Sequence, residues 1–515
     1  MRKITRHLCM MALSVMPLSL SAQEIHVIRG NCLPDAPGDA ALARAARPYR
    51  LSRPNTSWDS TFIYKSPVIL VTFSDMEFSM ENPRERYDSI FNRKGYNEGK
   101  GVGCVADYFR MQSGGLFNTQ FDVYGPVKVN TPAKSSAEEN HGQDVFRQAA
   151  QAADALVDFS EYDWNGDGKV EQTVFVYAGY GGNEAADICQ GHIWPNTSSF
   201  STVYADGVSV SNYTASAEKW SINKLCGIGT ICHEFSHSLG LPDLYPTGSS
   251  ATEYSVVDQW DLMDGGNFIN TGWCPTNYSA LEKMLLGWLT PVELTEPATV
   301  VDLKPVSEGG QAYIIRHTAN EYLLLENRQW IGWDLRSPGH GLLISHVDYN
   351  SSAWLGNTVN NTPSHHRYDF FHADNMNYDD WDKLIGDNNP TVGGHNRILS
   401  TSPYPYLPGD GGDANRDLTD DSTPAAKMFN NNSDMKQMLS KAITDIYETQ
   451  EGLISFKFMG GDSSTAIGGI VNRDMMPERA AYDIYGRRVA SSLSNRNPQL
   501  RIIRQVDGTF RKVIR

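Results

Sequence analysis

His233 and His237 are four residues apart in the sequence, and Glu234 lies between them. On an α-helix this spacing places both imidazoles on one face, about one turn apart, as a tetrahedral zinc ion requires. Glu234 is badly placed to be a ligand and well placed to hydrogen-bond a zinc-bound water as general base. The pattern predicts attack of that water on a peptide bond. The alternative is an amphipathic core helix with solvated polar side chains.

The residues after the second histidine can supply a third ligand. Gly240 can end the helix because glycine adopts left-handed backbone at no steric cost, and Pro242 then directs the chain out of helical geometry. Asp243 can therefore return towards the metal. Two histidines and one carboxylate leave a fourth position open, as a catalytic zinc requires. The expected ligands are His233, His237 and Asp243, with Glu326 or Glu282 as the third ligand if the turn points Asp243 away.

Met263 lies in a second informative run, residues 260–266, which by itself is typical of a tight turn with methionine as core filler. After the helix motif, the order of His, Glu, His, Gly and a methionine turn resembles the metzincin metallopeptidases. This resemblance implies an α/β (α+β), metzincin-like catalytic domain in which Met263 forms an apolar base under the metal. Metzincins usually carry histidine as third ligand. Asp243 resembles instead the small snapalysin-like peptidases.

Several stretches together resemble the immune inhibitor A family of secreted metallopeptidases. They are residues 107–109, 112–115, 233–245, 260–263, 281–288 and 322–329. The similarity runs from about Lys65 to Gly460. It implies a secreted zinc metalloendopeptidase, made as a precursor, that acts on proteins or peptides.

A loop rich in oxygen donors spans residues 163–171. Asp163, Asn165 and Asp167 occupy positions 1, 3 and 5 of an EF-hand-like pattern, but position 12 is Val174 and the flanking sequence favours a strand. We therefore expect a calcium loop of another kind. Its ligands would be Asp163, Asn165 and Asp167, the carbonyl of Lys169, and Glu171. The alternative is an Asx-rich turn without an ion.

Cys32 lies in the run 29–35, which resembles the pro-segment motif by which matrix metallopeptidases place a thiolate on their zinc. A thiolate there would displace the catalytic water and keep the precursor latent. The order Asn-Cys replaces the Cys-Gly of that motif. A disulfide or a free cysteine in a pro-segment is the alternative, since six cysteines remain after residue 22 and their pairing is open.

The elements that must position these groups follow from hydrophobic periodicity. Strands are predicted at 68–73 and 173–179, and helices from 105 to about 113 and over 223–239. The last helix should bury its apolar face in the core, through Ile228, Cys232, Phe235 and Leu239. Strands and helices therefore alternate up to about Pro291, as in an α/β domain.

Beyond Pro291 the pattern becomes β-rich, with a closing strand at 453–458. The segment 357–434 is dense in Asn, Asp, Gly and Pro and is interpreted as long surface loop. The expected organisation is a signal peptide (1–22), a pro-segment or linker (23–60), a catalytic domain (61–291), a β-rich domain (292–460), a linker (461–475) and a small C-terminal β module (476–515). The last module resembles the sorting domains of type IX secretion.

Charge and hydropathy exclude some partners. The sequence contains 60 Asp and Glu residues and 44 Lys and Arg residues, which gives a formal net charge of −16. A nucleic-acid partner is therefore not expected, because its phosphates would be repelled. Basic residues 2, 3 and 6 precede an apolar run that is typical of export, and no later stretch is long enough for a membrane span. We expect a secreted or cell-surface monomer. The competing functions are a catalytically silent surface-binding protein on the same scaffold and a zinc hydrolase of a non-peptide bond.

Overall fold

The computed structural model describes residues 58–134, 142–183, 189, 191–248, 255–376, 399–408 and 412–462, together with the backbone of six short strands outside these ranges. The expected signal peptide, Cys32 and most of the expected linker lie outside the described residues. The chain divides into two compact units, Met1–Ala466 and Ile467–Arg515. Among the described residues, no helix combines the length and apolar character needed to cross a membrane.

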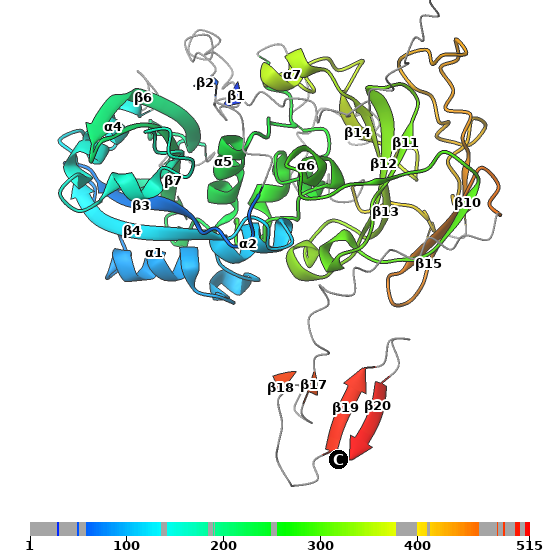
Figure 1. Cartoon of the computed structure of the whole chain (residues 1–515), viewed down its shortest axis with the longest axis horizontal. Helices are drawn as coiled ribbons and strands as arrows, with labels where there is room; N and C mark the ends of the chain where they lie inside the picture. Colours follow the sequence, from blue (N-terminus) through cyan, green and yellow to red (C-terminus); the bar gives the residue numbers. More distant parts are fainter. Residues whose placement is uncertain are drawn as a thin grey trace, which may run out of the picture. The chain divides into compact units, whose positions relative to one another are not determined.

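A mixed six-stranded sheet forms one part of the first unit (Figure 1). Its order is β4-β3-β5-β7-β6, and β8 pairs with β7 off this path. β3, β4, β5 and β7 run parallel, whereas β6 is an antiparallel edge strand. The strands are β3 (Tyr64–Thr72), β4 (Thr119–Lys128), β5 (Thr173–Tyr180), β6 (Asn196–Ala205), β7 (Val208–Ser221) and β8 (Lys224–Leu225).

Helices cover both faces of this sheet because its central strands are apolar on both sides. Val68 and Leu70 of β3 point into one hydrophobic core, and the alternate residues Ile69 and Val71 point into another. The first core is shared with α1 (Pro83–Asn92), α2 (Val105–Gln112) and α5 (Gly229–Leu239), and the second with α4 (Gln143–Ala153). The predicted strands in β3 and β5 and the predicted helix in α2 are confirmed.

The predicted start of the histidine helix is wrong. Residues 224–225 form β8, which pairs with β7, and the helix begins only at Gly229. Gly227 and Gly229 explain the delay, since they pass against the backbone of residues 267–273. A Cβ on Gly229 would lie 1.9 Å from the carbonyl oxygen of Asn267. This crossing fixes where the helix begins.

The β-rich part predicted beyond Pro291 is confirmed as two sheets. The five-stranded sheet has the order β14-β13-β12-β11-β9 and the three-stranded sheet the order β10-β16-β15. The strands are β9 (Val292–Glu293), β10 (Ala298–Leu303), β11 (Tyr313–Arg316), β12 (Glu321–Arg328), β13 (Gly341–Asp348), β14 (Tyr368–Phe370), β15 (Ile443–Glu448) and β16 (Ile454–Phe458). Leu324 and Leu343 also enter the core that contains α5, so the two parts share one core.

The interpretation of 357–434 as surface loop is wrong for much of its described length. The backbone is largely irregular, but Tyr404, Leu418 and Met428 are buried in the core between the two β-rich sheets. These apolar residues are spaced without a helix or strand period, so periodicity did not reveal them. The segment therefore covers part of the β-rich core.

The remaining described elements are short. Single-turn helices lie at η1 (Glu98–Lys100), η2 (Phe159–Tyr162), η3 (Asp258–Trp260), η4 (Gly265–Phe268), η5 (Val306–Glu308) and η6 (Gly332–Asp334), and short α-helices at α6 (Ala280–Leu285) and α7 (Ser351–Leu355). β1 (Ile28–Arg29) and β2 (Tyr49–Arg50) pair with each other. In the second unit, β17 (Ala481–Tyr482), β18 (Arg488–Val489), β19 (Leu500–Arg504) and β20 (Phe510–Ile514) form a four-stranded sheet.

Candidate metal centre

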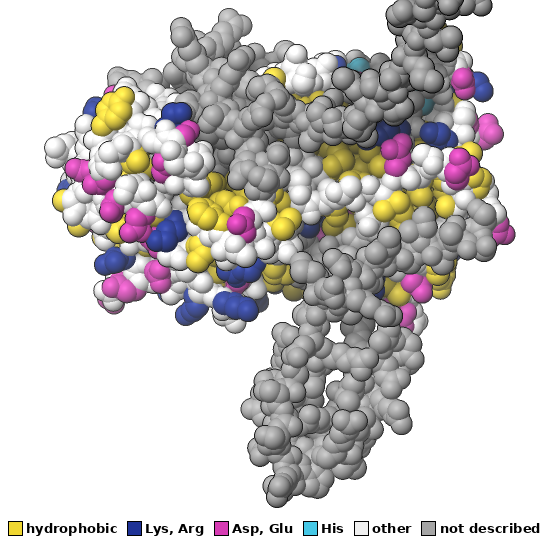
Figure 2. Space-filling model, viewed as in Figure 1, with side chains coloured by type: hydrophobic (Ala, Val, Ile, Leu, Met, Phe, Trp, Pro, Cys, Tyr) yellow, Lys and Arg dark blue, Asp and Glu magenta, His cyan; other side chains and the backbone are white. Residues whose placement is uncertain are grey.

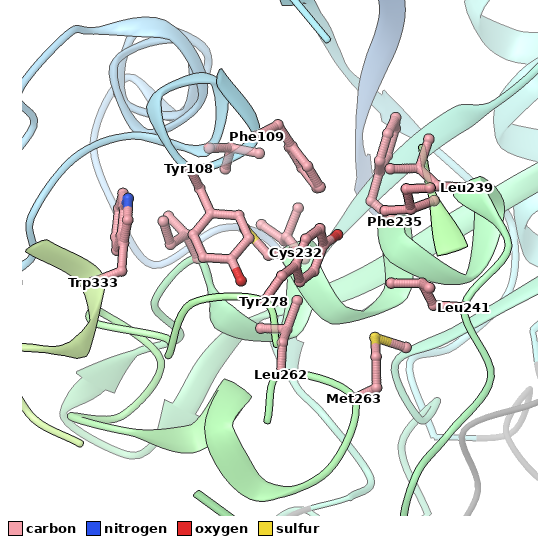
Figure 3. Packing of buried hydrophobic residues seen from close by; sticks show 14 of the residues in the cluster. Tyr108, Phe109, Cys232, Phe235, Leu239, Leu241, Leu262, Met263, Tyr278 and Trp333 are labelled. Atoms are coloured by element: carbon pink, nitrogen blue, oxygen red, sulfur yellow. The ribbon is translucent and has the colours of Figure 1, made fainter. Parts of the chain in front are cut away.

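The histidine helix α5 is buried along its whole length. Cys232, Phe235 and Leu239 point from it into the hydrophobic core, together with Tyr108 and Phe109 of α2 (Figure 3). At its end, Gly240 has φ +121° and its amide donates to the carbonyls of Ser236 and His237. Glycine tolerates this backbone because it lacks a Cβ. The helix therefore stops where the sequence predicted.

The structure brings the three expected zinc ligands together. Nε2 of His233 lies 3.2 Å from Oδ1 of Asp243, and Nε2 of His237 lies 3.3 Å from the same oxygen. All three side chains are at least 97% buried. Within the described part of the chain, they are the group of three metal-binding side chains whose ligand atoms all lie within 4.8 Å of one another.

Backbone carbonyls fix the orientation of both imidazoles. Nδ1 of His233 lies 2.8 Å from the carbonyl oxygen of Leu262, and Nδ1 of His237 lies 2.7 Å from that of Leu241. A carbonyl only accepts, so each Nδ1 carries a hydrogen and donates it. In the neutral imidazole, each Nε2 then presents a lone pair towards Asp243. Two lone pairs and a carboxylate that face one another need a cation between them, and this donor set suits zinc.

Asp243 is held as a carboxylate. Burial by itself would raise its pKa, but positive charge at the Nε2 atoms of His237 and His233, which face the carboxylate, brings the pKa well below the usual range, and a metal cation in that position would act in the same direction. Neither Glu282 nor Glu326 joins the group of three. Glu282 accepts from the amide of Ser279 at the start of α6, and Glu326 accepts from the amide of Ala280. The geometry therefore favours Asp243 over both alternatives.

Asn357 is a residue of this site that sequence reasoning missed. Its Nδ2 donates to Oδ2 of Asp243 at 2.6 Å, and its Oδ1 accepts from the amide of Asp243 at 2.7 Å. Asn360 donates to the carbonyl of Leu244, and Asn361 accepts from the amide of Thr247. The cluster of asparagines at 357–361 was the available signal. It lay in a segment that was interpreted as surface loop.

Replacing Asn357 is expected to weaken metal binding without removing a ligand. The Asn357→Ala variant should bind zinc about 10- to 100-fold more weakly, because Oδ2 of Asp243 loses the partner that orients the carboxylate. Competition with a chromogenic chelator measures this affinity. Asn361→Ala is the matched control, since Asn361 holds Thr247 and contacts none of the three ligands. Equal affinities in the two variants would contradict the role given to Asn357.

Met263 and its neighbours connect the two halves of the site through their backbone. The carbonyl of Met263 accepts from the amide of Leu244, next to Asp243, while the carbonyl of Leu262 accepts from His233. The Met263 side chain is fully buried, and Figure 3 shows it close to Leu241 on one side of α5. The turn therefore connects His233 on the helix with the loop that carries Asp243, two of the expected ligands.

Glu234 lies in the middle of α5 and is 98% buried. Its backbone carbonyl accepts from Oγ1 of Thr197 on β6 at 2.5 Å, which ties this turn of the helix to the edge strand of the sheet. In the sequence, Glu234 directly follows His233, the first of the expected ligands. A carboxylate at this place can take a proton from a water next to the metal.

The expected calcium loop at 163–171 is a closed turn. The carboxylate of Asp163 accepts from the amides of Gly166, Asp167 and Gly168 at 2.8 to 3.1 Å. Burial raises the pKa of Glu171 to about 7, and Asp163 and Asp167 add to the effect. The donors are close in sequence, but the loop does not form a group of three carboxylates at metal-binding distance among the described residues.

Comparison with known proteins identifies the segment that carries this centre. Residues 65–288 match the catalytic domain of the immune inhibitor A peptidases, family M6. Immune inhibitor A of Bacillus thuringiensis subsp. alesti is 24% identical over 270 residues, which cover 42% of this chain and 38% of that protein. The pre-pro-metalloprotease PrtV of Vibrio cholerae serotype O1 (strain M66-2) is 22% identical over 269 residues, which cover 45% of this chain and 28% of that protein.

The matched region extends from β3 to Trp288, three residues after α6, and it includes α5, Asp243 and Met263. The chain spans less than two fifths of the length of these curated relatives. The resemblance to the immune inhibitor A family is confirmed for residues 65–288, which are similar to the catalytic domain of the M6 peptidases.

Proposed function

We propose that the chain is a secreted zinc-dependent metalloendopeptidase that cleaves peptide bonds in proteins. The observation that carries the proposal is the buried group of His233, His237 and Asp243, with both Nε2 atoms turned towards one carboxylate oxygen. The M6 match and the relatives named as metalloproteases support the same activity. Zinc, when bound, would polarise the scissile carbonyl and lower the pKa of a nearby water.

In this mechanism each residue has a separate task. His233, His237 and Asp243 hold the metal, and Asn357 and the turn at 261–264 keep these three in position. Glu234 takes a proton from the attacking water and passes it to the leaving amide nitrogen. The burial of Glu234 and the ligands excludes bulk water, which strengthens the electrostatic interactions inside the site.

The test is metal content together with casein hydrolysis, on protein purified from Gln23 onward, before and after limited trypsin treatment. We expect one zinc per chain and hydrolysis that a chelator abolishes, that added zinc restores and that trypsin increases. Bound zinc without cleavage of any protein would favour a silent binding protein. A panel of ester substrates would then separate that function from a non-peptide hydrolase. A chain that binds no zinc would overturn the proposal.

The domain organisation proposed with this function keeps the expected boundaries. The metzincin-like catalytic domain spans 61–291 and the β-rich domain 292–460, with their interface in the shared core of α5, β12 and β13. Export through the signal peptide at 1–22, latency through Cys32, and sorting through the module at 476–515 belong to the same proposal. The same proposal includes a secreted monomer that acts on protein substrates.

Calcium is a second proposed ion, bound at 163–171 by Asp163, Asn165, Asp167, Glu171 and the carbonyl of Lys169. Calcium should raise the midpoint of thermal unfolding by about 2 °C or more, because an ion that binds only the folded state stabilises it. The Asp167→Asn variant should lose most of that rise. Asp167 is the better position for the test because Asp163 also holds the turn itself. No response to calcium in the wild type would leave an Asx turn without an ion.

A further inference from the structure

Asp261 and Glu282 are two carboxyl groups that meet in the core beside the metal centre. Asp261 belongs to the turn that carries Met263, and Glu282 belongs to α6. Both are at least 99% buried, and their carboxyl groups lie close enough for each to affect the charge of the other. A hydrogen bond between two carboxyl groups requires a proton on one of them.

Each carboxyl uses one oxygen for its own turn. Oδ1 of Asp261 accepts from the amide of Met263 at 2.8 Å, and Oε2 of Glu282 accepts from the amide of Ser279 at 2.6 Å. The other oxygens, Oδ2 of Asp261 and Oε1 of Glu282, are buried and have no donor among the described residues. A proton shared between these two oxygens satisfies both. Without it, two carboxylates would repel each other in a dry core.

The groups that face the pair do not replace this proton. They are Ser279 and Tyr278 before α6, Lys283 on α6, Arg328 on β12, Tyr108 on α2 and Tyr368 on β14. The single hydroxyl hydrogen of Ser279 is donated to Oε2 of Glu282, the oxygen that also accepts from the amide of Ser279. Arg328 makes two hydrogen bonds of 2.7 Å to Asp334. Burial raises the pKa values of the three tyrosines, so they keep their protons. Tyr108 donates to the carbonyl of Thr276, Tyr278 bonds the hydroxyl of Ser236, and the hydroxyl of Tyr368 has no partner among the described residues, so none of them makes a hydrogen bond to the pair. Burial lowers the pKa of Lys283 to about 8. Loss of a proton from Lys283 is therefore a second candidate cause of any change in zinc affinity at alkaline pH.

We propose that Asp261 and Glu282 form a proton-sharing carboxyl pair that positions the metal ligands. The turn at 261–264 accepts from His233 through Leu262 and from the loop of Asp243 through Met263. The pair anchors that turn to α6. Loss of the proton separates Asp261 from Glu282 and releases the turn that orients His233 and Asp243. The two carboxyls are positioning residues, since they do not touch the three ligands by any described contact.

The direction of the pH effect follows from linkage. Burial, followed by the charge of Asp261, raises the pKa of Glu282 well above its ordinary value of 4.5. Above that value the unfolded chain loses a proton that the folded chain keeps, so folding stability falls as pH rises through the window up to the folded pKa. The same loss should loosen the zinc site at alkaline pH. Histidine deprotonation works in the opposite direction, because it favours zinc binding as pH rises.

Infrared spectroscopy of the metal-free protein tests the proton itself. We expect a protonated carboxyl band in the wild type near neutral pH that loses the same component in both Glu282→Gln and Asp261→Asn, as seen in the difference spectra; Glu171, Asp264 and Glu326, whose pKa values are also raised, contribute the remaining intensity in all variants. In each variant the new amide donates a hydrogen bond to the remaining carboxylate, so the contact survives without the proton. Glu321→Gln is the matched control and should keep the band. Glu321 is equally buried, but hydrogen bonds from His346 and from the amides of residues 429 and 430 outweigh burial and lower its pKa.

Zinc affinity as a function of pH tests the positioning role. From about pH 7 to pH 9 the wild-type affinity should fall about tenfold, and Glu282→Gln should show no such fall, because an amide cannot lose this proton. Lys283→Met should keep the wild-type fall, which separates the pair from the titration of the lysine. Two results would overturn the proposal: an unchanged band in both amide variants, or an alkaline fall that Lys283→Met removes and Glu282→Gln keeps.

The inference rests on the proposed function only in its consequence for catalysis. The infrared band and the zinc affinity do not require hydrolysis of a peptide bond. If zinc binds but no protein is cleaved, the proposed activity fails while both readouts still decide the fate of the pair. If hydrolysis occurs, its alkaline limb should move upward by about one pH unit or more in Glu282→Gln.

Discussion

Glu234→Gln is expected to lower peptide hydrolysis by about a thousandfold or more while zinc stays bound, which lies in the upper part of the range for a general base. The amide has almost the same shape as the carboxylate but cannot accept the proton of the attacking water. His233, His237 and Asp243 remain unchanged, so metal content should match that of the wild type. The measurements are kcat/KM on a fluorogenic peptide and zinc per chain.

The control for Glu234→Gln is the same substitution at Glu448. This side chain lies on β15 and hydrogen-bonds His340 and Gln329, in the β-rich part of the chain. Glu448→Gln should keep wild-type kcat/KM. Wild-type hydrolysis in Glu234→Gln would refute the assigned base, whereas loss of zinc together with activity would show that the substitution disturbs the ligands instead.

The metal centre could be predicted from sequence because its essential geometry is local. His233 and His237 are related by the helical repeat, and a glycine with positive φ at position 240 turns the chain so that Asp243 faces them. Both features depend on a few consecutive residues. Alternating burial on β3 and β5 was also readable, because strands between two layers of helices are apolar on both faces.

The supporting contacts could not be predicted because they join distant parts of the chain. Asn357 reaches Asp243 across 114 residues, and Arg328 of β12 reaches Thr276, the segment before α6, across 52 residues. No short pattern encodes such pairs. The late start of α5 has the same origin, since the close approach of Gly229 to Asn267 is a tertiary constraint on a segment that local propensity extends as helix. The sequence thus predicted the three proposed ligands but not the residues that hold them in position.

Among the residues of the site, Asp243 is the one whose substitution should lower zinc affinity most, because it is both an expected ligand and the acceptor for Asn357. Asp243→Ala removes the only carboxylate of the three-ligand group and leaves Nδ2 of Asn357 without its acceptor in a buried site. Two imidazoles on one helix face provide two of the ligands that a catalytic zinc needs. Zinc affinity should therefore fall by more than about a hundredfold, beyond the effect of losing a supporting residue, and hydrolysis should disappear with it.

Chelator competition, circular dichroism and kcat/KM together decide the outcome for Asp243→Ala. Retained helix and sheet signals with lost zinc locate the effect at the metal, because α5 is held in the core by Cys232, Phe235 and Leu239 independently of Asp243. Asp144→Ala, at an exposed position on α4, should bind zinc like the wild type. Zinc content that survives Asp243→Ala would move the third ligand elsewhere. Glu282→Ala and Glu326→Ala would then be the next variants to test, although the structure directs both side chains to the start of α6.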